Sequence, residues 1–243
     1  MHRFSAFAAI AALATICAPA ASAASVVIWP IDPTLAPTEK ATVLWIENQG
    51  NDPVTMQVRA LAWSQIDGED RLADQGEVIA SPPIATIAPR ARQLVRLVRR
   101  SAISDQQEDE AQSAYRLLID ELPAPEPQSS EATTAAPRLS VQMRYSLPLF
   151  AYSAAPDAIA PYLETRIVTR DGTRQLAISN RGAEHARLTD LTTANGAHPQ
   201  SVKPGLVGYV LPGATLYVPV TPGMGDTMQV TVNGTPEVIG PKA

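Results

Sequence analysis

Few residues in this chain have the types and spacing that catalysis or metal binding requires. His185 and His198 stand thirteen residues apart on separate expected elements, with no cysteine or acidic cluster at ligand spacing nearby. No serine lies in a Gly-x-Ser-x-Gly elbow, and no glycine-rich phosphate loop follows an expected strand. We therefore expect no enzyme activity, no metal site and no cofactor.

One arginine, Arg96, needs a charge partner if the pattern around it is buried. In the segment 93–99, QLVRLVR, the interior is apolar on both faces apart from this guanidinium. An unpaired charge in such a place costs several kcal/mol. Two kinds of partner are open: an internal carboxylate, Glu47 or Asp120, or a carboxylate that another protein brings, which the fork of a guanidinium suits.

The longest regular pattern in the chain is the segment 139–150, LSVQMRYSLPLF. Every odd position from Leu139 to Leu149 is apolar or aromatic and the even positions are mostly polar, a period of two that predicts a long β-strand. The preceding segment 124–137 consists of Pro, Ala, Ser, Thr, Glu and one Gln, a composition that packs no core. The pattern fits either an ordinary half-buried strand or an exposed edge to which another chain adds a strand.

The elements that position these residues are expected to be strands. The chain has 22 prolines and 13 glycines, which separate short segments rich in Val, Ile, Leu and Thr, as in antiparallel β-sandwiches. The expected strands are 25–29, 41–48, 54–63, 93–99, 114–122 and 139–152 in the first half, and 163–169, 175–180, 186–193, 215–220 and 227–232 in the second.

The order of these strands suggests two domains. The segment 46–50, IENQG, recurs as 178–182, ISNRG, which favours two related sandwiches in tandem. Between the halves, the small residues and proline of 153–157 are typical of a short hinge. We therefore expect one domain over 24–153 and a second over 157–243.

Residues 1–23 have the form of a secretory signal peptide. Arg3 supplies the positive start, 7–17 is a largely apolar core, and the small residues 21–23 fit a cleavage site. The single cysteine, Cys17, lies inside this segment, so the exported chain is expected to hold no thiol or disulfide. Without Arg3 the chain carries 18 basic and 24 acidic residues, a net charge of 18 − 24 = −6, which argues against nucleic acid as a partner. No later apolar run approaches the roughly 20 residues of a membrane helix.

A set of segments in the first half occurs in a recognisable order: 38–48, 81–84 with 87–89, 93–97, 115–123 and 147–150. Taken together, they resemble periplasmic pilus-assembly chaperones of the PapD-like, chaperone-usher family. The second half matches more weakly, mainly at 178–180 and around Pro212. Residues 27–30, VIWP, look more like the archaic branch of the family.

The resemblance implies an all-β fold of two immunoglobulin-like sandwiches arranged in an L. It implies donor-strand complementation, in which the chaperone lends a strand to a fimbrial subunit that lacks its own last strand, caps it, and delivers it to an outer-membrane usher. The expected location is the periplasm, and the expected partners are fimbrial subunits and the usher, with no membrane span in the mature chain. The expected donor residues are Leu139, Val141, Met143, Tyr145 and Leu147.

The chain also departs from the family. Its relatives hold the subunit's terminal carboxylate with two basic residues, but the matching positions here fall near Asp32 and on Pro148, neither of which is basic. Arg144 has the same parity as Pro148, and Arg96 lies on a neighbouring strand in the family. These two arginines are the expected substitutes.

Two other classes of function remain as alternatives. A structural or adhesive component of a surface fibre would typically have an extended N-terminal donor segment and one sandwich, whereas the alternating strand here is internal. A glycan-binding module could use Trp29, Trp45 and Trp63 as platforms. Each tryptophan lies within or at the end of an apolar strand, so we expect all three to pack into cores.

Overall fold

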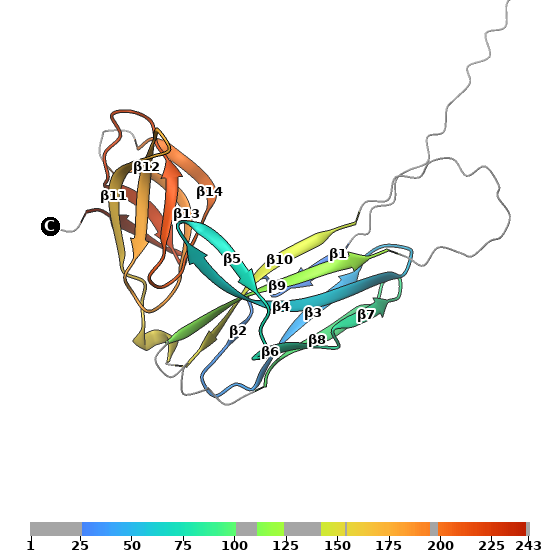
Figure 1. Cartoon of the computed structure of the whole chain (residues 1–243). Coiled ribbons are helices and arrows are strands. Elements are labelled where there is room, and N and C mark those ends of the chain that lie inside the picture. Colours follow the sequence, from blue (N-terminus) through green and yellow to red (C-terminus); the bar gives the residue numbers. More distant parts are fainter. Residues whose placement is uncertain (1–25, 101–110, 124–141, 154, 195–198, 242–243) are drawn as a thin grey trace, which may run out of the picture.

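The computed structural model describes residues 26–100, 111–123, 142–153, 155–194 and 199–241. These residues form seventeen β-strands and one single-turn 3-10 helix, η1 (Pro156–Ala158). They make two β-sandwiches that follow one another along the chain and meet at an angle (Figure 1). The expected all-β fold of two tandem sandwiches is therefore confirmed. Within the described part, no helix has the length and apolar character needed to cross a membrane.

The first sandwich consists of two antiparallel-rich sheets, which we name sheets A and B. Their strand orders are β1-β3-β8-β6 and β2-β10-β9-β4-β5, with β7 also paired to β4. Alternate side chains of the two sheets meet in a buried core that includes Leu44 and Leu97 of sheet A and Leu117 and Leu149 of sheet B. The strands are β1 (Val26–Trp29), β2 (Thr34–Leu35), β3 (Ala41–Asn48), β4 (Val54–Ile66), β5 (Glu69–Ala73), β6 (Val78–Ser81), β7 (Ile84–Ile87), β8 (Arg92–Arg99), β9 (Gln112–Leu122) and β10 (Arg144–Tyr152).

The second sandwich consists of sheets C and D. Sheet C has the order β11-β12-β15, and sheet D has the order β14-β13-β16-β17. Their facing side chains, among them Ile178, Leu188, Val218 and Val230, form the second buried core. The strands are β11 (Leu163–Arg170), β12 (Thr173–Asn180), β13 (Ala186–Thr193), β14 (Ser201–Val210), β15 (Thr215–Pro219), β16 (Met228–Val232) and β17 (Thr235–Ile239).

The junction between the sandwiches is itself packed. Trp63, Phe150 and Tyr152 come from the first sandwich but belong to the buried cluster of the second. The side chain of Gln65 bonds to the second sandwich twice, donating to the carbonyl of Tyr209 at 3.0 Å and accepting from the N–H of Leu211 at 2.9 Å. These contacts explain why the two arms keep a defined angle and are not joined by a linker alone.

A long hairpin braces this junction. β4 and β5 extend beyond the body of the first sandwich, and in Figure 1 their turn reaches the second sandwich. At the turn the carbonyl of Asp67 accepts a hydrogen bond from Arg170 at 2.6 Å, and Gly68 lies against the ring of Tyr217 so closely that a Cβ would collide with it. Gly68 also has φ +82°, which a side chain disfavours. Glycine at this position therefore serves both the turn and the contact.

Candidate functional site

The most unusual feature of the fold is the open edge of β10. This strand pairs with β9 along its whole length, from Arg144 to Tyr152. On its other side it pairs with β2 at two positions, Phe150 and Ala151. Over Arg144–Leu149, therefore, no described residue pairs with that side of the strand. An uncovered strand edge can accept a further strand from another chain.

Hydrogen bonds at the two ends of β10 show which backbone groups face the open edge. The N–H of Phe150 points toward β2, to the carbonyl of Pro33, whereas the carbonyl of Met143 points toward β9, to the N–H of Glu121. The direction of the backbone N–H and C=O groups alternates from one residue to the next along a strand. The backbone groups of the even-numbered residues therefore face the open edge. Arg144 and Ser146 present an N–H and a C=O there, and Pro148 presents a C=O alone. A proline is tolerated at such an edge because no ladder bond is lost.

The odd-numbered side chains of β10 face the core of the first sandwich with increasing burial. Met143 is 39% exposed, Tyr145 and Leu147 are half-buried against the core, and Leu149 is fully buried. Burial raises the pKa of the Tyr145 hydroxyl, and Glu121 adds to the effect. Three of the expected donor residues thus lie along the open edge. The other two, Leu139 and Val141, lie outside the described residues.

The even-numbered side chains of β10 lie on the outer face of sheet B, where they border a charged cluster. Asp120 of β9 accepts a hydrogen bond from Arg59 at 2.8 Å and another from Arg144. The Asp120 side chain is 12% exposed, whereas those of Arg59 and Arg144 are 44% and 64% exposed. Burial alone would raise the pKa of Asp120, but the hydrogen bonds from the two arginines outweigh it and hold this pKa below its ordinary value. The carboxylate is therefore charged and shared between two cations.

Arg96 does not lie where the sequence pattern suggested. Its side chain is exposed on the outer face of sheet A, because Val95 and Leu97 carry the buried parity of β8. The two expected internal partners are engaged elsewhere: Glu47 pairs with Arg92 and Asp120 pairs with Arg59 and Arg144. The interpretation of Arg96 as a buried, internally paired charge is wrong. β8 also pairs with β3 and β6, not with β10, so Arg96 and Arg144 are not brought together.

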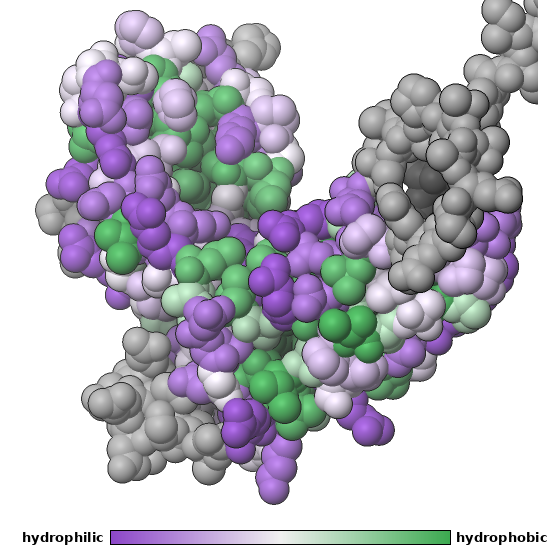
Figure 2. Space-filling view, turned by 45° about the vertical axis from the view of Figure 1, so that its right-hand side comes forward, coloured by the Kyte–Doolittle hydropathy of each residue, from purple (hydrophilic) through white to green (hydrophobic). Residues whose placement is uncertain are grey.

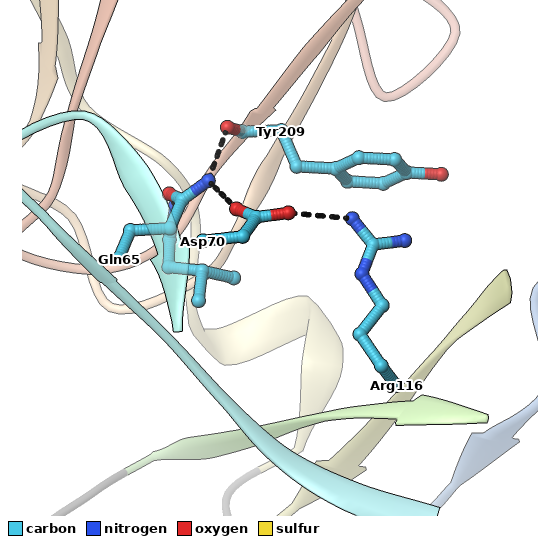
Figure 3. A network of polar contacts seen from close by, with 5 residues as sticks. Gln65, Asp70, Arg116 and Tyr209 are labelled. Carbon is cyan, nitrogen blue, oxygen red and sulfur yellow. Dashed lines mark hydrogen bonds and ion pairs between the residues drawn. The ribbon is translucent and has the colours of Figure 1, made fainter. Parts of the chain in front are cut away.

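Arg116 is a residue that sequence reasoning missed. It lies on β9 directly opposite Pro148, at the end of the outer face where the two sandwiches meet. Its guanidinium lies 3.6 Å from the ring centroid of Trp63 and 5.3 Å from that of Tyr209. It also reaches Asp70 at 3.5 Å, and Figure 3 shows this ion pair next to Tyr209. The side chain is 14% exposed, and burial lowers the pKa of this arginine despite the nearby Asp70. Because the Arg116 guanidinium packs against two rings and forms a single long ion pair, it has further N–H donors for a carboxylate from another chain.

An open angle separates the two sandwiches on the outside of the molecule. Figure 2 shows this angle, with hydrophilic surface where the first sandwich borders it. The sequence signal for Arg116 was present but local. Arg116, Leu118 and Asp120 share a parity on β9, and the contacts of Arg116 with Trp63 and Tyr209 reveal that its side chain lies where the two sandwiches meet.

The histidines and tryptophans have mostly structural surroundings. His185 stacks on Phe150 with ring centroids 3.5 Å apart, and burial lowers its pKa to about 4. His198 lies outside the described residues, and no group of three metal-binding side chains occurs among those described.

Trp63 is buried as expected. The expectation for Trp29 and Trp45 is wrong, since they stack on each other, half-buried, on the outer face of sheet A.

Comparisons with known proteins agree with this geometry. The family model for the PapD N-terminal domain of pili and flagellar-assembly chaperones matches residues 33–159. A crystal structure of the CsuC–CsuE chaperone–tip adhesion subunit pre-assembly complex, from the archaic chaperone-usher Csu pili of Acinetobacter baumannii, contains a chain 27% identical to this one. The TM-score is 0.71, over 90% of this chain and 100% of that one.

Two further structures share the fold at lower identity. The structure of the Salmonella enterica SafA pilin with the SafB chaperone matches with 19% identity and a TM-score of 0.61, over 89% of this chain and 96% of that one. The E. coli chaperone DraB matches with 15% identity and a TM-score of 0.60, over 89% and 93%. Among curated protein sequences, no significant match to the chain is found.

Proposed function

The chain belongs to the PapD family of pili and flagellar-assembly chaperones, and we propose that it captures and caps fimbrial subunits by donor-strand complementation. Membership of a chaperone family favours this role over that of a fibre component or an enzyme. The strand lent to the subunit is β10, and its apolar odd positions enter the subunit. In this proposal Met143, Tyr145 and Leu147 act together with Leu139 and Val141, which precede them at the same parity.

The observation that carries the proposal is the combination of an open backbone edge with inward apolar side chains on the same strand. An added strand would bond to the free groups of Arg144 and Ser146 and would continue sheet B. Its own inward side chains would pack beside Met143, Tyr145 and Leu147, which the first sandwich covers only in part. Main-chain bonds supply affinity in such an arrangement, and alternate side chains supply specificity.

The proposed location is the periplasm. Residues 1–23 are proposed to act as the signal peptide, so that the mature chain begins near Ala24, with the first domain over 24–153 and the second over 157–243. Delivery of the captured subunit to an outer-membrane usher completes the proposed pathway. The CsuC–CsuE complex comes from a chaperone-usher system, and the SafA–SafB complex also joins a chaperone to a pilin. These relatives support this step.

The proposed anchor for the subunit's terminal carboxylate is an arginine on the outer face of sheet B. Of the two expected substitutes, Arg144 borders the open edge, while Arg96 faces away on sheet A. Arg116 is a third candidate, and its position favours it over both. It lies opposite Pro148, where the family has a basic residue, and its partly desolvated guanidinium strengthens any charge pair that it forms.

Co-expression tests the proposed capture. Candidate subunits should accumulate in soluble form with the chain and should aggregate or be degraded without it. Met143→Asp should abolish this protection, because the carboxylate enters an apolar groove unpaired, at a cost of several kcal/mol. The same change should leave the free chaperone folded, since Met143 is exposed in the absence of a partner.

The matched control is Gln142→Asp, which places the same charge one position earlier, on the exposed even parity. It should protect subunits almost as well as the unchanged chain. Equal subunit yield with and without the chaperone would refute capture. Unfolding of isolated Met143→Asp, seen by circular dichroism, would instead place Met143 in the protein's own core and remove it from the donor set.

A further inference from the structure

The ion cluster on the outer face of sheet B has two guanidinium groups around one shared carboxylate. Arg59, Asp120 and Arg144 come from three adjacent strands, β4, β9 and β10, so that one carboxylate stands between two guanidinium groups. Glu121 borders the same hollow, where it accepts a hydrogen bond from the N–H of Met143. No other described carboxylate forms an ion pair with Arg59 or Arg144. Arg144 therefore has one ion-pair partner, Asp120, which it shares with Arg59.

The two arginines differ in their distance from the open edge. Arg59 lies on β4, two strands away, whereas Arg144 lies on β10 itself and is the first strand residue at the open side. Arg144 binds Asp120 through Nε, and no ion pair joins its two Nη groups to another described residue. With 64% of its side chain exposed, Arg144 can present these donors to a neighbour on the next strand.

A strand that pairs with β10 brings its own side chains to this cluster. Residues directly opposite in neighbouring strands have Cβ atoms about 4.5–5.5 Å apart, and they interact when they share a face. The residue opposite Arg144 therefore stands beside an exposed guanidinium whose Nη donors form no ion pair with any other described residue. A lysine or arginine there would be repelled, while a carboxylate would be bound.

We infer that the subunit strand pairing with β10 carries an aspartate or glutamate that binds Arg144. The inference rests on the proposed subunit capture and specifies the chemistry of the partner. That strand has apolar side chains on the parity that faces the core and an acidic side chain on the outward parity at the Arg144 end. Arg144 thereby selects among subunits, while the apolar positions bind them all.

A pair of matched variants tests the role of Arg144. Arg144→Glu and Arg59→Glu each remove one ion pair to Asp120, but only the first alters the residue at the open edge. With the subunit that co-purifies with the chain as the probe, Arg144→Glu should weaken capture about tenfold and Arg59→Glu about twofold at most. Changing the acidic residue of the subunit strand to lysine should restore the affinity of Arg144→Glu and weaken that of the unchanged chain.

The possible results separate the inference from the proposed function. Equal losses in the two variants would mean that Arg144 only supports Asp120, which overturns the inference. Loss of the Arg144 effect when the subunit's C-terminus is amidated would identify a terminal carboxylate and would also overturn it. In both cases subunit capture by the unchanged chain, and its loss in Met143→Asp, would leave the proposed function standing. Failure of the unchanged chain to capture any subunit would refute both.

Discussion

The two sandwiches treat their edge strands in opposite ways. In the second sandwich, β14 borders sheet D and is irregular: its pairing with β13 shifts register three times, and Pro204 and Gly205 lie in its middle. In the first sandwich, β10 pairs with β9 without any shift over its nine residues. Bulges and prolines are devices that keep a strand edge from pairing with other chains. β14 is thus poorly suited to pairing with another chain, whereas β10 stays regular and has one proline, Pro148, at its open edge.

In one respect the sandwiches are alike. Asn48 and Asn180 end corresponding strands, and each side chain is 1% exposed. The Asn48 amide donates to the carbonyls of Asp52 and Ile87 and accepts from the N–H of Gly50. The Asn180 amide donates to Glu184 and Val210 and accepts from Gly182. The repeated sequence segment therefore has a structural reason in both sandwiches, whereas the strands β10 and β14 differ.

The largest expected loss of subunit capture comes from an arginine beside β10, with an arginine beside β14 as its control. Arg116 lies opposite Pro148 of β10, and Arg187 lies opposite Tyr209 of β14. Arg116→Gln should weaken subunit capture at least thirtyfold, because truncating one partner of a desolvated charge pair costs about 2 to 5 kcal/mol of binding. Arg187→Gln, an exposed control, should not change capture. Titration of a labelled subunit measures both affinities.

Amidation of the subunit's C-terminus tests whether Arg116 binds the terminal carboxylate. An amidated C-terminus should weaken binding to the unchanged chain and should make no further difference to Arg116→Gln. A drop in melting temperature of Arg116→Gln without a capture defect would show that the residue serves only the junction, through Asp70, Trp63 and Tyr209.

The next effect concerns the feature that the sandwiches share. Asn48→Ala and Asn180→Ala should each lower the free energy of unfolding by about 2 to 3 kcal/mol, because each leaves buried backbone groups without partners. Urea denaturation followed by circular dichroism measures the loss. A loss in one variant and none in the other would mean that the repeat is only a likeness of sequence.

The junction between the sandwiches should respond to pH through His185. Burial lowers the pKa of folded His185 to about 4, whereas the ordinary value is 6.5. Above pH 6.5 the residue is neutral in both states and contributes no pH dependence. Below pH 6.5 the unfolded chain binds a proton that the folded chain refuses, so stability falls as pH falls, by up to about 1.4 kcal/mol per pH unit, until pH 4.

Denaturation between pH 7 and 5.5 tests this prediction above the range where carboxylates titrate. The slope should be shallower in His185→Gln than in the unchanged chain. Parallel curves for the two proteins would show that His185 is accessible to protons in the folded state.

The smallest effect comes from a second proline in β10, two residues before Pro148. The N–H of Ser146 points to the open edge, so Ser146→Pro removes a donor that the free chain does not use. We expect capture to weaken about fivefold, the value of one hydrogen bond, with the fold intact. Ser146→Ala retains the donor and should behave as the unchanged chain. Binding by native gel shift compares them, and unfolding of Ser146→Pro would contradict the assigned direction of this N–H.

Strands with one apolar and one polar face could be predicted from the sequence. Strands whose two faces are alike were missed, or their buried face was assigned wrongly. β10, β4 and β9 alternate clearly and were expected. β5 was missed because all five of its residues are exposed, and β14 was missed because Pro204 and Gly205 interrupt its pattern. In β8 the run is apolar on both faces, so period two could not decide which parity is buried, and Arg96 was placed on the wrong side.

The same limit applies to the candidate site. The apolar parity of β10, which carries the proposed donor residues, follows from local alternation, which one strand contains by itself. The surroundings of Arg116 come from Pro148 on β10, from Trp63 on the other neighbouring strand, β4, and from Tyr209 of the second sandwich. Such relations arise from pairing register and domain packing, which no local pattern encodes.

Pro148 has a further consequence for how a partner strand settles on β10. Alternation alone cannot tell a correct alignment from one displaced by two residues, because such a slide returns every side chain to the same face. The missing N–H of Pro148 limits how far such a strand can extend: a strand that runs past Pro148 leaves one of its carbonyls unbonded there, whereas a strand that ends before Pro148 does not. The proline therefore favours alignments in which the added strand ends before it, without any contact of its own side chain.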